Sequence, residues 1–205
     1  MKLKAFIKRI IDAAMILSKT VEAMCIGEIG QAVCRYDVNV TVDAYLKNIK
    51  GKTASLFSTA CELGAIEAGC GSDTVKKLKC FGEYLGIMFQ FRDDLLDFTS
   101  SGAAEGKETH KDFHDGIYTL PVLKALEATE GRAALLPIMR ENAKRSLSAQ
   151  EIEAMEKNVI RCGGVERTIE EIHRYAALAR EILDSLEDIP EARKIRRMLD
   201  KLESI

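Results

Sequence analysis

Three aspartates stand within five positions of an otherwise apolar segment, "FQFRDDLLDF", residues 89–98. If this segment is helical, Asp93 and Asp97 lie on one face, one turn apart, with Asp94 beside them. Carboxylates packed so closely repel one another unless a cation sits between them. Oxygen ligands without His or Cys are typical of a Mg²⁺ site that bridges to phosphate oxygens. Because the flanking residues are too apolar for a solvated acidic surface, the segment predicts magnesium and phosphate chemistry.

A bound phosphate group also needs cations and hydrogen-bond donors, and candidates stand elsewhere in the chain. Lys52 and Thr53 follow a glycine in "KNIKGKTASLF". A glycine inside a helix costs about 1 kcal/mol relative to alanine, which makes it a plausible kink where the backbone opens toward a ligand. Gln90 precedes the first aspartate by three residues and shares its face, and Lys107 lies in the loop after the cluster. We expect these side chains to converge on the aspartates.

A different metal chemistry is open to the segment "HKDFH", residues 110–114. His110 and His114, together with Asp112, would suit zinc or copper if the segment were helical, because residues four apart face one way. The segment is expected to be loop, and a further strong ligand is not evident. The magnesium interpretation is therefore favoured over this one.

Composition restricts the class of protein. The chain has 205 residues, 47% of them hydrophobic, which is enough for one domain with a substantial core. Its 30 Lys and Arg nearly balance 32 Asp and Glu, so no nucleic-acid surface is indicated. Six cysteines without a CxxC pair predict free thiols in a reducing compartment, and no segment approaches the roughly 20 apolar residues of a membrane span. We expect a cytoplasmic protein.

Helical spacing of apolar residues runs through almost the whole chain, and period-two alternation is confined to residues 36–42. The pattern predicts an all-α protein with a single domain, residues 1–205, and a long functional loop after the aspartates. A first helix is predicted from about residue 3 into the low 30s, a second from a Thr41 cap to about Ala68, and a third from a Ser72 or Asp73 cap to near Phe98. A short helix is predicted to begin at Thr119 and Pro121, and another to run from a Ser148–Glu151 capping box to the glycines at 163 and 164. Two more helices are predicted between Val165 and the C-terminus, the last from about Pro190.

In this order, the motifs resemble those of the trans-prenyl diphosphate synthases, or polyprenyl synthetases. "YLKNIKGKTASLFSTACELGA" is similar to the family's Lys-Thr helix, and "LGIMFQFRDDLLDF" to its Phe-Gln segment with the second aspartate-rich motif. "EGKETHKDFHDGIYTLPVLKAL" resembles the loop and helix that follow, and "GEIGQ" and "CGGVERTIEEIHRYAALAREILDSL" fit as well. The resemblance spans nearly the whole chain. It implies an isoprenoid-synthase-type helical bundle that lacks the family's N-terminal helices.

The resemblance also implies a mechanism. Mg²⁺ ions held by aspartates assist the loss of diphosphate from an allylic substrate, and the double bond of isopentenyl diphosphate attacks the carbocation, giving a linear polyprenyl diphosphate. The resemblance implies that Asp93 ligates Mg²⁺, with Asp94 and Asp97 beside it directly or through water, and that Asp112 supports metal-bound waters. It implies that Lys52, Gln90 and Lys107 contact the allylic diphosphate. Thr53 and Phe89 are implied to lie beside the reacting substrate.

Two departures from the family pattern stand out. Ile117 replaces a lysine of many short-chain members, which favours a longer product. More importantly, there is no Gly-Gly-Lys-x-x-Arg segment, no first DDxxD and no Arg-Arg pair after it, so the chain corresponds to roughly the C-terminal two thirds of the family. It is expected to be one piece of a split enzyme, a truncated product or an inactive subunit. Each case predicts exposed apolar surface, and hence a homo-oligomer or a heteromer with a subunit carrying the missing DDxxD.

Two other functions stay open beside prenyl transfer. The first is a non-catalytic structural or regulatory subunit of a heteromeric prenyl synthase, which would apply if no assembly containing the chain converts substrate to product. A terpene cyclase, which uses a related helical fold, fits less well because its usual second metal motif is built on Asn, Ser or Thr, and Glu. Elongated linear diphosphates would distinguish a synthase from a cyclase, which makes cyclised hydrocarbons.

Overall fold

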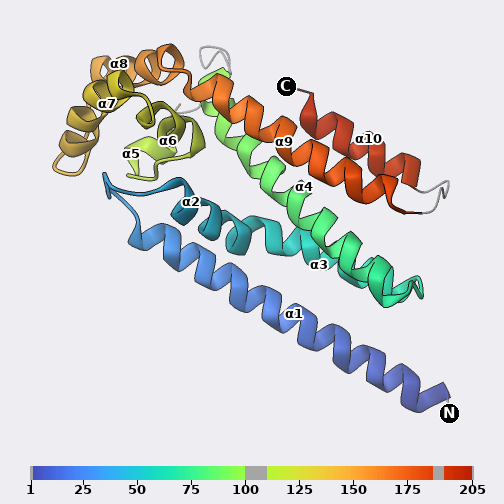
Figure 1. The fold of residues 1–205 in the computed structure, drawn as a ribbon. Helices are drawn as coiled ribbons and strands as arrows, with labels where there is room; N and C mark the ends of the chain where they lie inside the picture. The colour runs from blue at the N-terminus through green and yellow to red at the C-terminus, as the bar shows by residue number, and fades with distance from the viewer. Residues whose placement is uncertain (1, 100–109, 187–191, 205) are drawn as a thin grey trace.

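A computed structural model describes residues 2–99, 110–186 and 192–204, and these ranges are largely helical with no strand among them (Figure 1). The all-α prediction is confirmed. The elements are α1 (Lys2–Val33), α2 (Val42–Ile49), the π-helix η1 (Lys50–Ala54), α3 (Ser55–Glu67), α4 (Ser72–Thr99), α5 (Lys111–His114), α6 (Leu120–Leu126), α7 (Thr129–Asn142), α8 (Ala149–Arg161), α9 (Gly164–Asp184) and α10 (Ala192–Glu203).

The long helices lie in layers (Figure 1). Helix α1 forms one edge and packs against α2, η1 and α3, which follow one another as a nearly continuous rod. Helix α4 lies between α3 and α9, and α10 covers α9 at the opposite edge. The short helices α5 to α8 gather at one end. This arrangement places the segment that carries the three aspartates, the C-terminal part of α4, beside the short helices.

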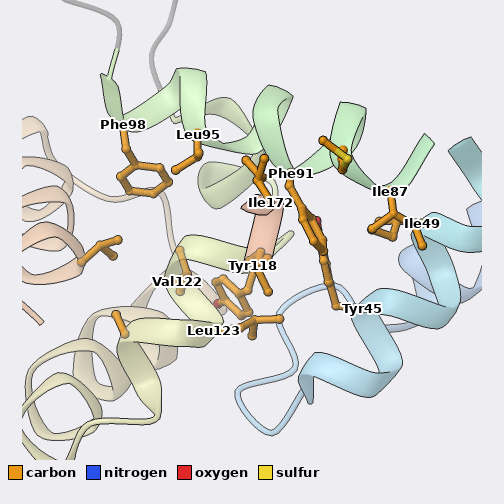
Figure 2. Packing of buried hydrophobic residues seen from close by; sticks show 14 of the residues in the cluster. Tyr45, Ile49, Ile87, Phe91, Leu95, Phe98, Tyr118, Val122, Leu123 and Ile172 are labelled. Atoms are coloured by element: carbon orange, nitrogen blue, oxygen red, sulfur yellow. The ribbon is translucent and has the colours of Figure 1, made fainter. Parts of the chain in front are cut away.

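Helix α4 is the centre of the core. The helix contributes four large residues that are each at most 1% exposed: Phe81, Ile87, Met88 and Phe91. Figure 2 shows Ile87 and Phe91 facing Ile49 and Tyr45 of α2, with Tyr118, Val122 and Leu123 packed below them. Because neighbours cover α4 on more than one side, its apolar residues do not form a single stripe. A charged residue on this helix must therefore face the helix's open side or be hydrogen-bonded inside.

Three of the predicted helix boundaries are confirmed by capping contacts or by backbone conformation. The Thr41 hydroxyl accepts a hydrogen bond from the Ala44 amide at 3.1 Å and caps α2. Ser148 and Glu151 form the predicted capping box of α8. Gly163, with a φ of 75°, ends α8 and precedes α9, a conformation that glycine adopts without strain.

Three details of the predicted helices are wrong or missing. Ser72 is the first residue of α4 and not its cap. The segment 111–114, expected to be loop, forms the single turn α5. Helix α7 was not predicted, and Pro137 inside it explains why, since an internal proline is usually read as a helix breaker.

Candidate active site

The predicted kink before Lys52 is the π-helix η1, which interrupts the rod of α2 and α3. Short π-helical turns occur frequently at functional sites. Two glycines allow α1 to approach this turn closely. A Cβ added to Gly27 would lie 2.3 Å from the backbone nitrogen of Lys52, and one added to Gly51 would lie 2.6 Å from the carbonyl oxygen of Ala23. Lys52 and Thr53 therefore project from a backbone that is fixed against α1.

Lys52 is held by two polar side chains of α1. Its Nζ lies 2.9 Å from an Oε2 of Glu28 and donates a hydrogen bond of 2.6 Å to Oε1 of Gln31. Both residues belong to "GEIGQ", a stretch that the family resemblance picked out without giving it a role. Their spacing of three on a helix was the available signal that they act together.

Thr53, Gln90 and the aspartates form a chain of hydrogen bonds. The Thr53 hydroxyl donates to Oε1 of Gln90 at 2.8 Å. Nε2 of Gln90 donates to Asp94 at 3.0 Å and, at 3.4 Å, to Asp93. The structure thus brings together Thr53, Gln90 and Asp93, three of the four predicted catalytic residues, although they come from two segments about forty positions apart in the sequence.

Asp94 points into the core, and its side chain is only 4% exposed. Besides Gln90, it accepts hydrogen bonds from the Tyr45 hydroxyl at 2.5 Å and from the Leu120 amide at 3.3 Å. Burial raises the pKa of Asp94 to about 7, and the three donors oppose that rise. Burial, followed by the charge of Asp94, raises the pKa of Tyr45 well above its usual value. Tyr45 was not predicted as a site residue, because a tyrosine among helically spaced apolar residues predicts a position in the hydrophobic core.

Asp112 of α5 joins the acidic group from the other side of the loop. Burial raises the pKa of Asp112, the Lys52 charge opposes the rise, and the Asp93 charge adds to it. Burial and then the charge of Asp112 raise the pKa of Asp97. Asp93 and Asp112 thus influence one another and Asp97, and the Lys52 charge reaches Asp112.

This donor set fits a hard divalent cation. Asp93 is exposed, and Asp97 and Asp112 are half-buried, so carboxylate oxygens that repel one another border a surface open to solvent. A Mg²⁺ ion that keeps part of its water shell would relieve the repulsion without close convergence of all three side chains. In the described ranges, no three His, Cys, Asp or Glu side chains already converge on one point. Contact would thus be partly through water or would need side-chain rotation.

The segment 110–114 does not present its two imidazoles together. His110 is buried, with its Nε2 3.5 Å from Glu156 of α8, whereas His114 is exposed. Asp112, between them, belongs electrostatically to the aspartate group described above. The geometry therefore gives no support to the zinc or copper alternative.

The remaining predicted residues lie at the margin of the site or outside the described ranges. The Phe89 side chain is 45% exposed, and its ring centre is 5.3 Å from that of Phe57 in α3. An aromatic pair left open to solvent beside Gln90 is suited to contact an apolar ligand. Lys107 falls in residues 100–109, outside the described part of the chain.

A family model described as polyprenyl synthetase matches residues 1–156. The chain belongs to the polyprenyl synthetase family. It is 36% identical over 187 residues to heptaprenyl diphosphate synthase component 2 of Geobacillus stearothermophilus, covering 91% of this chain and 57% of that protein. It is 34% identical to octaprenyl diphosphate synthase of Escherichia coli (strain K12), covering 85% of this chain and 54% of the relative. The chain thus spans little more than half the length of these relatives.

Solved structures of this family share the fold. A decaprenyl diphosphate synthase from Rhodobacter capsulatus superposes with a TM-score of 0.83 at 31% identity, covering 94% of this chain and 59% of the other. A polyprenyl synthase from Caulobacter crescentus CB15, complexed with calcium and isoprenyl diphosphate, gives a TM-score of 0.86 at 27% identity, covering 99% and 62% of the two chains. The isoprenoid-synthase type of helical bundle is confirmed.

The six cysteines are all free in the structure, as the absence of paired spacing predicted. A membrane-spanning helix was not expected, and none of the helices in the described ranges combines the length and the apolarity that crossing a bilayer requires.

Proposed function

We propose that this chain carries the diphosphate-ionising half of a trans-prenyltransferase that condenses isopentenyl diphosphate with an allylic diphosphate to make a linear polyprenyl diphosphate. The observation that carries the proposal is the convergence of Lys52, Gln90 and the aspartates from three separate segments of a polyprenyl synthetase fold. Family membership supports the same chemistry, since the relatives named above are prenyl diphosphate synthases. They favour prenyl transfer over the terpene-cyclase alternative.

In this proposal each side chain has a defined task. Asp93, with Asp97 and Asp112, would hold Mg²⁺, which would supply positive charge to neutralise the leaving diphosphate. The Lys52 ammonium and the Gln90 amide contact the diphosphate oxygens, and Lys107 is assigned the same role from its place in the sequence alone. Thr53 lies beside the reacting carbon, where its hydroxyl oxygen faces the developing cation. Phe89 contacts the apolar prenyl chain, which excludes water from a carbocation.

The reaction needs no protein nucleophile. The carbon–oxygen bond of the allylic diphosphate breaks and the electron pair leaves with the diphosphate. The double bond of isopentenyl diphosphate then forms the new carbon–carbon bond, and a proton is lost to the released diphosphate. Electrostatic stabilisation of the leaving group is therefore the main catalytic contribution expected from this chain.

A labelled isopentenyl diphosphate assay with an allylic primer tests the function. It is run with this chain alone and with a co-encoded protein that carries a DDxxD. Since "DDLLD" is the only DDxxD in these 205 residues, we expect elongation only with the partner. Elongation by the isolated chain would refute the need for a partner. If no mixture elongates and Mg²⁺ does not promote pyrophosphate binding, the non-catalytic subunit is the better interpretation.

The outer face of α1 supports association with another helical chain. Leu3, Ile7, Ile10, Leu17 and Val21 are each 47% to 69% exposed. With the exposed Ala14 between them, they recur at alternating intervals of four and three, the heptad spacing of a coiled-coil seam. The opposite face of α1 packs against the rod of α2, η1 and α3 (Figure 1). We propose that the outer face binds a helix of a subunit that carries the other DDxxD; binding of a second copy is the alternative that sedimentation of the chain alone distinguishes.

Replacing Ile10 and Leu17 together by glutamate is expected to abolish this association. Both side chains are about half exposed in the described structure, so helix content should be retained while the apolar seam is interrupted by charge. Analytical ultracentrifugation, alone and with the partner, measures the effect. Lys19→Glu, an exposed change on the same helix outside the seam, is the control. An unchanged sedimentation coefficient in the double variant would assign the interface to another surface.

A further inference from the structure

The carboxylate of Asp94 joins four elements of the fold inside the protein. Its hydrogen-bond donors are the Tyr45 hydroxyl from α2, the Gln90 amide from α4 itself and the Leu120 amide at the start of α6. Gln90 in turn accepts from Thr53 in η1. A surface carboxylate would be hydrated and free to rotate, but this one is fixed by protein groups on both of its oxygens.

No ion pair joins Asp94 to a cation within the described ranges. A buried carboxylate is tolerated only if hydrogen bonds replace its hydration, and here three donors do so. The Tyr45 ring is fixed as well, since it stacks on Phe91 with ring centres 6.2 Å apart and an angle of 19° between planes. Phe91 meets the edge of Tyr175 in α9 at 5.6 Å. The donor is thus held by aromatic packing as well as by its hydrogen bond.

The carboxylates also determine which way the Gln90 amide faces. The NH₂ group of Gln90 donates to the oxygens of Asp93 and Asp94, and the Gln90 oxygen accepts from Thr53. Thr53 must then donate its proton to Gln90. Its oxygen lone pairs are left for the open side of the site, where a developing positive charge would be stabilised by them.

We propose that Asp94 and Tyr45 are positioning residues, which set the orientation of Gln90 and Thr53 from inside the protein, and that Asp94 is not itself a ligand of the metal. Asp93, one residue earlier, is exposed and keeps the metal-binding role. The inference rests on the proposed function and deepens it, because it divides the aspartate motif into one inward-facing and two outward-facing carboxylates.

Asp94→Asn and Asp93→Asn distinguish positioning from ligation. An amide at position 94 keeps one acceptor oxygen, so it can serve either the Gln90 amide or the Tyr45 hydroxyl and the Leu120 amide, but not all three donors. We expect Asp94→Asn to lower kcat by about 100-fold in the active assembly while Mg²⁺-dependent binding of inorganic pyrophosphate stays within about threefold of wild type. Asp93→Asn should weaken that binding by more than about tenfold. Calorimetry measures the binding.

Tyr45→Phe tests the second residue with a matched control. Losing this hydroxyl should lower kcat by about tenfold and leave the KM for the allylic diphosphate nearly unchanged. Tyr118 is a similarly buried tyrosine, 4% exposed, whose hydroxyl donates to the Met139 carbonyl oxygen at 3.3 Å. Tyr118→Phe should leave kcat unchanged. Equal effects of the two variants on kcat would overturn the role of Tyr45.

The outcomes separate this inference from the proposed function. If Asp94→Asn weakens Mg²⁺-dependent pyrophosphate binding as much as Asp93→Asn does, Asp94 is a ligand and the inference alone is overturned. If the wild-type chain binds no pyrophosphate in the presence of Mg²⁺, the proposed function fails and the inference with it. Circular dichroism of each variant, at a temperature well below its unfolding midpoint, establishes that the protein measured is folded.

Discussion

Replacing Asp93 by asparagine is expected to reduce prenyl transfer by on the order of 10³-fold, a loss typical of removing one electrostatic contact to a transition state. Asp93 is the exposed first aspartate of the motif, and among the described residues only Gln90 donates a hydrogen bond to its carboxylate. Asparagine keeps the size of the side chain and removes the charge that attracts the metal. Labelled isopentenyl diphosphate incorporation, measured over a Mg²⁺ titration, gives the effect on rate and on metal dependence.

Asp73→Asn on the same helix is the matched control for this variant. Asp73 lies in the first turn of α4, where it pairs with Lys77 at 3.1 Å on the surface. An exposed pair of this kind contributes little to stability, so Asp73→Asn should have near-normal activity. If higher Mg²⁺ concentration fails to restore any activity to Asp93→Asn, steps beyond metal binding are affected. If Asp93→Asn is as active as Asp73→Asn, the metal role of Asp93 is wrong.

The aspartate motif illustrates what the sequence could predict about the site. Residue type and helical spacing indicated that Asp93 and Asp97 share a face, and both lie at the solvent side of α4. They did not indicate that Asp94 points inward, because its direction depends on Tyr45 and on the Leu120 amide, which are distant in sequence. Hydrogen bonds between remote segments leave no local pattern, so Tyr45 could be found only from the fold.

Lys52 gives a second example. The glycine before it correctly indicated an irregular helix, and the structure shows the π-helix η1. The partners of Lys52, Glu28 and Gln31, come from α1, whose register against η1 is set by tertiary packing. Helix existence follows from local periodicity, whereas helix register against a neighbour depends on close backbone contacts between segments. The all-α class was therefore predictable and the partners of the lysine were not.

Gly27→Ala is expected to destabilise the fold by about 3 kcal/mol or more, near the upper end of the usual cost of overpacking. The added methyl group would lie 2.3 Å from the backbone nitrogen of Lys52, 2.6 Å from the carbonyl oxygen of Asn48 and 2.9 Å from the carbonyl carbon of Gly51. All three atoms are backbone, so no side-chain rotation can make room. Either α1 separates from η1 or the π-helical turn is distorted. Urea unfolding followed by circular dichroism measures the loss.

Gly64→Ala is the matched control, because Gly64 is also inside a helix and a Cβ there would meet nothing within 4 Å. The higher helix propensity of alanine should stabilise that variant by up to about 1 kcal/mol, so the two substitutions are expected to have opposite signs. Distortion of η1 should also displace Lys52 from Glu28 and Gln31 and weaken pyrophosphate binding by Gly27→Ala. Equal stability of the two variants would mean that α1 does not fix the turn carrying Lys52, and the rigidity inferred for this part of the site would be wrong.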